Sequence, residues 1–71
     1  KIYPNPVTSE LSIKTNKNIE KFEIYNLIGQ KVLENTFSKK INVSSLSDGI
    51  YFLKLLNSDA YINDTFNFIK K

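Results

Sequence analysis

The chain has 71 residues and a net charge of +3, and it contains neither cysteine nor histidine. A chain of this length forms one small domain, and without Cys or His neither disulfides nor a structural zinc site can stabilise its fold. The commonest general base and the strongest side-chain nucleophile are also missing, so we expect no enzyme, no cofactor and no small-molecule substrate.

The first residues contain Pro4 and Pro6, and the chain does not begin with Met. Two prolines fix φ and remove two backbone donors, so this stretch cannot be a central strand. We expect residues 1–8 to form an extended, proline-rich lead-in from a larger upstream domain, with Tyr3 and Val7 leaning on the body of the C-terminal domain.

Residues 10–15 alternate polar and apolar side chains, which predicts a strand with one solvated face, and residues 16–18 predict a turn. Residues 19–26 could form a helix capped by Asn18, but such a helix would carry only two apolar residues on one face. The strand interpretation is favoured, and it divides the side chains into two faces. Phe22 and Ile24 point inward, while Glu23 and Tyr25 point outward.

Residues 26–29 predict a hairpin loop in which Gly29 takes the left-handed position after a type I turn and starts a bulge. The return strand covers residues 30–36. Val32 and Leu33 are neighbours and must face opposite ways, and we favour Val32 inward.

Leu27 and Ile28 lie at the tip of this hairpin, where polar residues are usual. We favour the interpretation that the two side chains fold back over the edge of the core. The alternative is that they form a possible docking surface for a partner.

Residues 41–43 predict a short strand, and residues 44–49 a loop with Leu46 as its single apolar anchor. Residues 50–56 follow an Asp-Gly turn and are apolar on both faces, which predicts a central strand. Its core-facing residues are Tyr51, Leu53 and Leu55. The segment around Tyr51 resembles a tyrosine corner, in which the hydroxyl bonds to an upstream backbone group.

The last part of the chain predicts a turn at 57–59, a short edge strand at 60–62, a turn at 63–64 and a final strand at 65–71. Phe66 and Phe68 share one face of the final strand. The count is about seven short strands without a helical period. We therefore predict an all-β fold, a small antiparallel immunoglobulin-like β-sandwich.

Charge placement excludes further function classes. All ten basic residues are lysines scattered along the chain, which is typical of solvated strand faces and does not favour nucleic acid as a partner. The seven acidic residues are dispersed and show no calcium-loop spacing, so no metal site is expected.

Several stretches, taken in order, resemble the C-terminal sorting domain of type IX secretion cargo (type A, the Por secretion system sorting domain family). The stretches are Tyr3–Pro6, Leu11–Ile13, Ile24–Val32, Ile41–Leu46, Gly49–Lys54 and Phe68–Lys71. One stretch alone would be weak evidence for this resemblance, but the ordered set spans residues 2–71 and is specific for the family.

The resemblance implies an export address joined to a preceding cargo domain. The cargo would pass through the periplasm, and the folded domain would be recognised by the outer-membrane type IX translocon and its shuttle protein. A cysteine-protease-like sortase would then remove the domain, leaving the cargo at the cell surface or in the medium.

The sorting-motif residues that the resemblance implies also have ordinary structural roles, since prolines end pairing, glycines permit turns and terminal lysines are solvated. They are Tyr3, Pro4, Asn5, Pro6, Gly29, Gly49, Tyr51, Lys70 and Lys71. We expect Lys70 and Lys71 to be exposed. The alternative function is a small binding or adhesion module, for example a carbohydrate-binding one. The lack of Trp, with only Tyr25 and Tyr61 expected to face outward, favours sorting.

Overall fold

The computed structural model describes residues 2–57 and 62–71, and within them it contains seven β-strands and no helix. In chain order the strands are β1 (Ile2–Tyr3), β2 (Glu10–Ile13), β3 (Lys21–Asn26), β4 (Lys31–Thr36), β5 (Lys40–Asn42), β6 (Gly49–Leu56) and β7 (Ile62–Lys70). Every pairing between two of these strands is antiparallel. The predicted all-β fold is confirmed.

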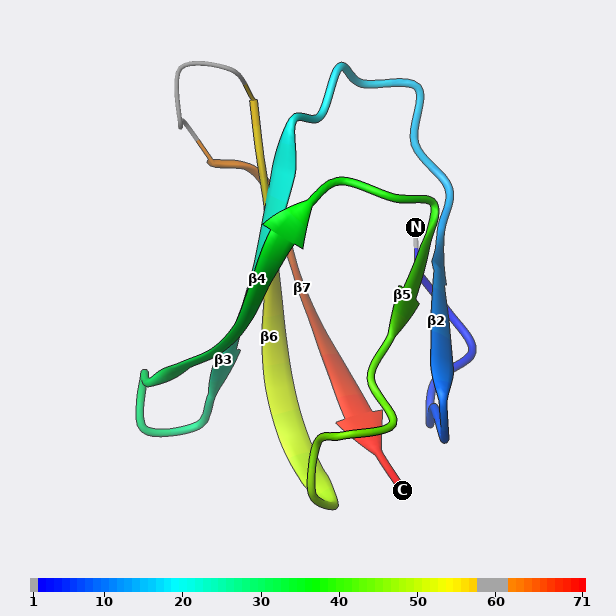
Figure 1. Cartoon of the computed structure of the whole chain (residues 1–71), viewed down its shortest axis with the longest axis vertical. Helices are drawn as coiled ribbons and strands as arrows, with labels where there is room; N and C mark the ends of the chain where they lie inside the picture. Colours follow the sequence, from blue (N-terminus) through cyan, green and yellow to red (C-terminus); the bar gives the residue numbers. More distant parts are fainter. Residues whose placement is uncertain (1, 58–61) are drawn as a thin grey trace.

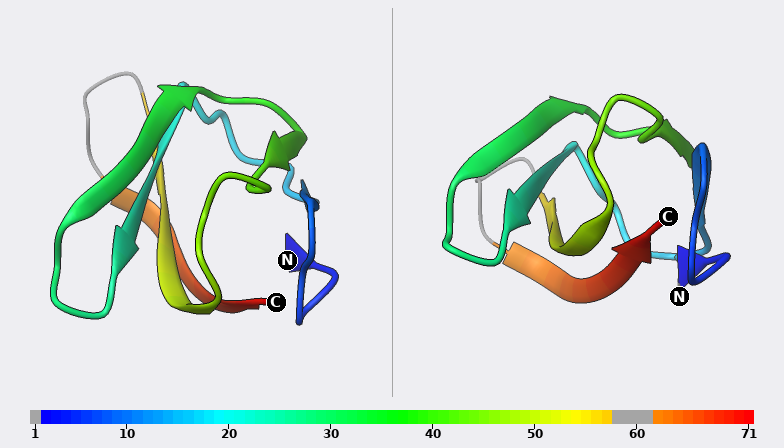
Figure 2. Two further views of the ribbon diagram at one scale, coloured as in Figure 1. Left: turned by 60° about the horizontal axis from the view of Figure 1, so that its bottom comes forward. Right: turned by 90° about the horizontal axis from the view of Figure 1, so that it is seen from below.

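The strands form two sheets, with the orders β1-β2-β5 and β4-β3-β6-β7. Figure 1 shows the four-stranded sheet on the left and β2 with β5 on the right, and the turned views in Figure 2 keep the two layers apart. In constant-type immunoglobulin domains the fourth strand lies beside the fifth. Here β4 lies beside β3 instead, at the edge of the other sheet.

The core lies between the two sheets, and β6 is central because it pairs with β3 on one side and β7 on the other. Leu53 shows the arrangement, since it is opposite both Ile24 and Phe66. The buried hydrophobic residues are Val7, Leu11, Ile13, Phe22, Ile24, Ile41, Val43, Tyr51, Leu53, Leu55, Leu56 and Phe68. The predicted inward residues of the central strand are therefore all confirmed, and Leu46 packs against this core as expected.

The predicted break near the end of the chain is wrong. β7 runs without interruption from Ile62, and Asp64, which we placed in a turn, is opposite Leu55 of β6. The long neighbouring strand pairs with Ile62 and Asp64 on either side of a bulge at Asn63, and this pairing outweighs the turn preference of Asn and Asp. Residues 58–61, which include Tyr61 and most of the predicted turn and edge strand, lie outside the described residues.

The first residues take part in the fold. Ile2 and Tyr3 form an edge strand opposite Ile13 and Ser12, a position that is compatible with the prolines that follow. The seventh strand therefore comes from the segment that we expected to be a lead-in. Val7 is fully buried, whereas Tyr3 is exposed.

In β4 the residue that faces the core is Leu33, so the expectation of Val32 inward is wrong. The register places Ile24 opposite Leu33 but Tyr25 opposite Lys31, so Val32 is the extra residue of a bulge. Leu33 packs against the core and Val32 is exposed. The alternation in the sequence required Val32 and Leu33 to face opposite ways, but it did not determine which of them would be the unpaired residue of the bulge.

Candidate functional site

Seven of the nine sorting-motif residues that the resemblance implies lie at one end of the sandwich, namely Asn5, Pro6, Gly29, Gly49, Tyr51, Lys70 and Lys71. The turn of the β3–β4 hairpin, the loop that enters β6, the end of β7 and the segment before β2 all lie toward the bottom of Figure 1. Gly49 is opposite Lys70, and residues 48–51 line a shallow pocket together with Leu27 and Ile28. We call this region, made of residues 5–7, 26–30, 47–51 and 69–71, the motif end.

The two ends of the chain are joined at the motif end by three hydrogen bonds. The Ile69 amide donates to Asn5 Oδ1 at 2.9 Å, the Val7 amide donates to the Ile69 carbonyl at 2.8 Å, and the Lys71 amide donates to the Val7 carbonyl at 2.9 Å. Val7 also forms a parallel bridge with Lys70. We call residues 5–7 and 69–71 the terminal clasp. It gives the end of β7 fixed backbone partners.

The expected exposure of Lys70 is wrong, because this side chain is only 7% exposed. Strand alternation puts it on the same side as the buried Phe68, and its ammonium group donates to the Lys71 carbonyl at 3.3 Å. Lys71 is exposed, as predicted. Of the two terminal lysines, Lys71 is therefore exposed to solvent and Lys70 is buried.

Tyr51 is a core residue that also fixes the loop before it. Its hydroxyl donates to the Ser47 carbonyl at 2.7 Å, so the predicted corner hydrogen bond is present. Its ring stacks on Phe68 with a centroid distance of 5.7 Å. Gly49, the first residue of β6, lies between Ser47 and Tyr51 in sequence and has φ +155, a conformation that other residues rarely adopt. Tyr51 thus connects the loop that enters β6 to the last strand.

The tip of the β3–β4 hairpin is held by one side chain. Asn26 Oδ1 accepts from the amides of Ile28 at 3.1 Å and Gln30 at 2.9 Å, and the Asn26 amide nitrogen Nδ2 donates to Gln30 Oε1 at 3.0 Å. Gly29 has φ +87, the left-handed conformation that was predicted for it. Leu27 and Ile28 do not fold back over the core but are exposed. The sequence indicated Leu27 and Ile28 as unusual turn residues, but it did not indicate that the Asn26 side chain holds the turn.

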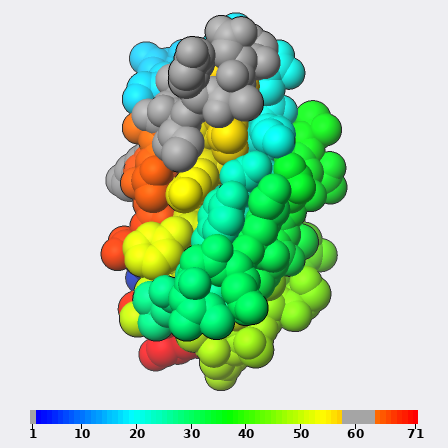
Figure 3. All heavy atoms as spheres, turned by 90° about the vertical axis from the view of Figure 1, so that its left-hand side faces the viewer, coloured from blue at the N-terminus to red at the C-terminus, as the bar shows by residue number. Residues whose placement is uncertain are grey.

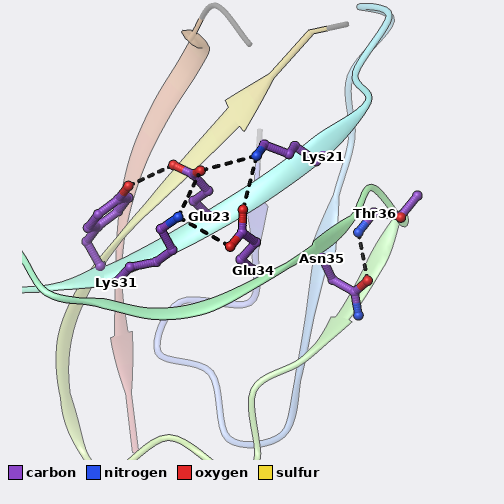
Figure 4. A network of polar contacts seen from close by, with 7 residues as sticks. Lys21, Glu23, Lys31, Glu34, Asn35 and Thr36 are labelled. Atoms are coloured by element: carbon purple, nitrogen blue, oxygen red, sulfur yellow. Dashed lines mark hydrogen bonds and ion pairs between the residues drawn. The ribbon is translucent and has the colours of Figure 1, made fainter.

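The outer face of the four-stranded sheet carries a polar network (Figure 4). Lys21 contacts Glu34 at 3.0 Å and Glu23 at 3.5 Å, while Lys31 contacts the same two carboxylates at 3.3 Å and 3.4 Å. The Tyr25 hydroxyl donates a hydrogen bond to Glu23 Oε1 at 2.8 Å. Glu23 does point outward as predicted, but these neighbours cover it so that it is only 8% exposed.

The network shifts the titration of its members. The Tyr25 hydrogen bond, aided by Lys31 and Lys21 and opposed by burial, lowers the pKa of Glu23. The same bond raises the pKa of Tyr25. The pKa of Glu34 is lowered by its bonds from Lys21 and Lys31. These charges satisfy one another on the sheet surface, an arrangement typical of structural stabilisation.

Tyr3 lies apart from the motif end. It is exposed and lines a shallow pocket on the three-stranded sheet with Ser12, Lys14 and Lys40, among others. It is therefore an outward tyrosine that the sequence analysis did not count among the possible stacking platforms, although its place before a proline on an edge strand was consistent with exposure.

The structure also limits other kinds of site. Residues 2–57 and 62–71 contain no group of three or more acidic, His or Cys side chains that could hold a metal ion. In the same described ranges, no helix is long and apolar enough to cross a membrane.

Comparison with known proteins gives a family. No curated protein and no solved structure matches the chain significantly. A family model, described as the secretion system C-terminal sorting domain, matches residues 1–70. This match covers nearly the whole chain and includes the terminal clasp except Lys71. The resemblance inferred from the ordered motifs is thereby confirmed, and the chain belongs to the family of type IX secretion system C-terminal sorting domains.

Proposed function

We propose that the folded domain is the address by which a covalently preceding cargo crosses the outer membrane, and that the motif end is the surface read by the translocon and its shuttle protein. Membership of the family makes the chain a C-terminal sorting signal of the type IX secretion system, which implies an exported protein of the cell surface or the extracellular space. The convergence of distant motif residues at one end supports the finer proposal.

The terminal clasp carries this proposal. Asn5 and Val7 provide the partners of Ile69 and Lys71 across more than sixty residues of sequence. A surface that another protein recognises must keep one geometry, because ordering it during binding would lower the affinity. The clasp keeps the last residues in one place.

The test is export of a reporter. Residues 1–71 are fused behind a periplasmic reporter in a host that has the secretion system, and we expect the reporter in the medium or on the cell surface. Asn5→Ala removes one clasp hydrogen bond and should lower export, whereas Asn16→Ala, an exposed Asn in the loop after β2, serves as the control. Retention of the unmodified fusion in the periplasm would refute the sorting role.

We propose further that a cysteine-protease-like sortase cuts the chain before Ile2. Ile2 and Tyr3 are paired with β2 and Val7 is buried, so the peptide bonds between Ile2 and Val7 are held within the folded domain. Proteases cut exposed, unpaired backbone most readily. The intact mass of the secreted reporter gives the cut position, and a cut between Tyr3 and Val7 would contradict this proposal.

A binding or adhesion module is the second candidate, and the exposed Tyr3 at its shallow pocket is the observation that favours it. Tyrosine rings offer an apolar face to sugars. Isothermal titration with a glycan panel tests it, with Tyr3→Ala as the matched variant. Heat release that Tyr3→Ala abolishes would support binding, and no heat release from any glycan would remove this candidate.

A further inference from the structure

Four exposed aliphatic side chains gather at the hairpin side of the motif end. Leu27, Ile28 and Ile50 line one shallow pocket, and Ile50 is directly opposite Ile69 on β7. Their exposed fractions are 63% for Leu27, 78% for Ile28, 43% for Ile50 and 41% for Ile69. Figure 3 shows the hairpin and the first half of β6 side by side on one face. We call these four residues the hairpin-tip patch.

The side chains of the hairpin-tip patch are not part of the hydrophobic core. None of its members belongs to the buried core or packs against it. Burying a large aliphatic side chain stabilises a protein by about 1.5–3 kcal/mol, so leaving several of them in water gives up stability. Contiguous exposed apolar residues on a small protein mark an interaction surface more often than isolated ones do.

The tip of the patch is rigid before any partner arrives. Asn26 Oδ1 accepts from the backbone of Ile28 and Gln30, and the Gly29 amide donates to the Asn26 carbonyl at 3.1 Å. These bonds fix the backbone that carries Leu27 and Ile28. A preorganised surface loses less entropy on binding, so it binds more tightly for the same contact area.

Shape and charge indicate what the patch fits. The hairpin projects from the sandwich at the lower left of Figure 1, so Leu27 and Ile28 in its turn are placed to enter a concave surface of a partner. On the surrounding outer face, Lys21 and Lys31 pair with Glu23 and Glu34, and two further lysines lie closer to the patch. Lys54 follows Ile50 by four positions on β6 and lies over the Tyr25 ring at 4.5 Å, and the exposed Lys71 follows Ile69 by two. Asp48 is the acidic residue that lines the patch pocket.

We propose that the hairpin-tip patch docks into an apolar pocket, rimmed by carboxylates, on a protein of the secretion machinery. The proposal rests on the sorting function and names the surface and the chemistry of its partner. Apolar side chains at the centre supply affinity, and the lysines at the rim favour an acidic partner over a basic one.

Export of the reporter fusion tests the proposal with a double variant, Leu27→Ser with Ile28→Ser. Both side chains are exposed, so we expect an unchanged thermal midpoint and roughly a tenfold or greater loss of export, the loss typical of removing a binding hot spot. The control is Val32→Ser, which removes an apolar side chain that is 38% exposed on the same hairpin but outside the patch pocket.

The outcomes separate the two proposals. Retention of the unmodified fusion overturns the sorting role and this proposal with it. Normal export of the unmodified fusion together with equal export of the double variant overturns only the docking patch.

A photo-crosslinking residue in place of Ile28 identifies what covers the patch, with the exposed Asn16 position in the loop after β2 as the control. A crosslink from position 28, and not from 16, to a secretion-system protein with an acid-rimmed apolar pocket supports the proposal. A crosslink to a second copy of the chain overturns it. So does co-sedimentation of the domain with vesicles of phosphatidylethanolamine and phosphatidylglycerol that the double variant loses.

Discussion

Replacing Val7 with Ala tests whether the proline-rich segment is part of the folded domain or only a connection to it. Val7 is fully buried, and its backbone bonds to Ile69 and Lys71 do not depend on its side chain. The substitution therefore removes two methyl groups from the core and leaves the clasp bonds available. Each buried methyl or methylene group contributes about 0.8 kcal/mol, and the cavity that remains adds to the loss.

The expected loss in the free energy of unfolding is about 2 kcal/mol. A chain of this length has a total stability of about 4–11 kcal/mol, so this loss is a large fraction of it. The midpoint of thermal unfolding should fall by about 8–16 °C. Urea unfolding should give a lower midpoint with an unchanged slope, because the extent of the exposed surface stays the same.

The matched control is Thr8→Ala, which changes the exposed neighbouring residue and should alter stability by less than about 0.5 kcal/mol. Hydrogen exchange adds a local measurement. The amides of Ile69 and Lys71, which donate within the clasp, should exchange faster in Val7→Ala than in the unmodified domain. If Val7→Ala unfolds at the same urea concentration as Thr8→Ala, the Val7 side chain does not contribute to the core, and the inference that the proline-rich segment is packed into the folded domain fails.

Three further substitutions probe the motif end and the sheet surface. Tyr51→Phe keeps the ring but removes the hydrogen bond to the Ser47 carbonyl, so chemical unfolding should show a free energy of unfolding lower by about 1 kcal/mol. An unchanged free energy of unfolding would show that this hydrogen bond does not stabilise the domain. Gly29→Ala meets no atom within 4 Å but must adopt φ +87, so a cost of about 1 kcal/mol is expected from backbone strain alone, checked by thermal unfolding. Glu23→Gln should flatten the acid side of the stability–pH profile. The lowered pKa of Glu23 means that its contribution is present above about pH 4.3 and is lost as the pH falls through the folded-state value. Equal acid sensitivity of the two proteins in urea unfolding at several pH values would contradict this.

The strands of the central sheet could be predicted because their side chains alternate and their turns are marked. Tyr51, Leu53 and Leu55 are buried as their spacing of two requires, and Gly29 has the positive φ that the hairpin needed. Local pattern was sufficient where each strand specifies its own two faces.

The pattern was not sufficient where a distant neighbour decides the outcome. Asp64 has a strong local preference for turns but lies in β7 because Leu55 is opposite it. Lys70 is covered because the segment around Val7 pairs with it from the other end of the chain. Val32 is exposed because the bulge falls at that residue and not at the next one. In each case the deciding contact is tertiary, which a single stretch of sequence does not encode.

The same tertiary contacts make the motif end depend on folding. The last residues of the chain take their backbone partners from two places, residues 5–7 and the beginning of β6. Neither partner is near in sequence, so a separated C-terminal peptide would lack the geometry that it has in the domain. The pairing between Gly49 and Lys70 further places the loop fixed by Tyr51 beside the clasp. On the proposal that the motif end is the address, this surface exists only after the whole sandwich has formed. Recognition of the motif end would therefore select folded domains over unfolded ones, without any catalytic group in the address itself.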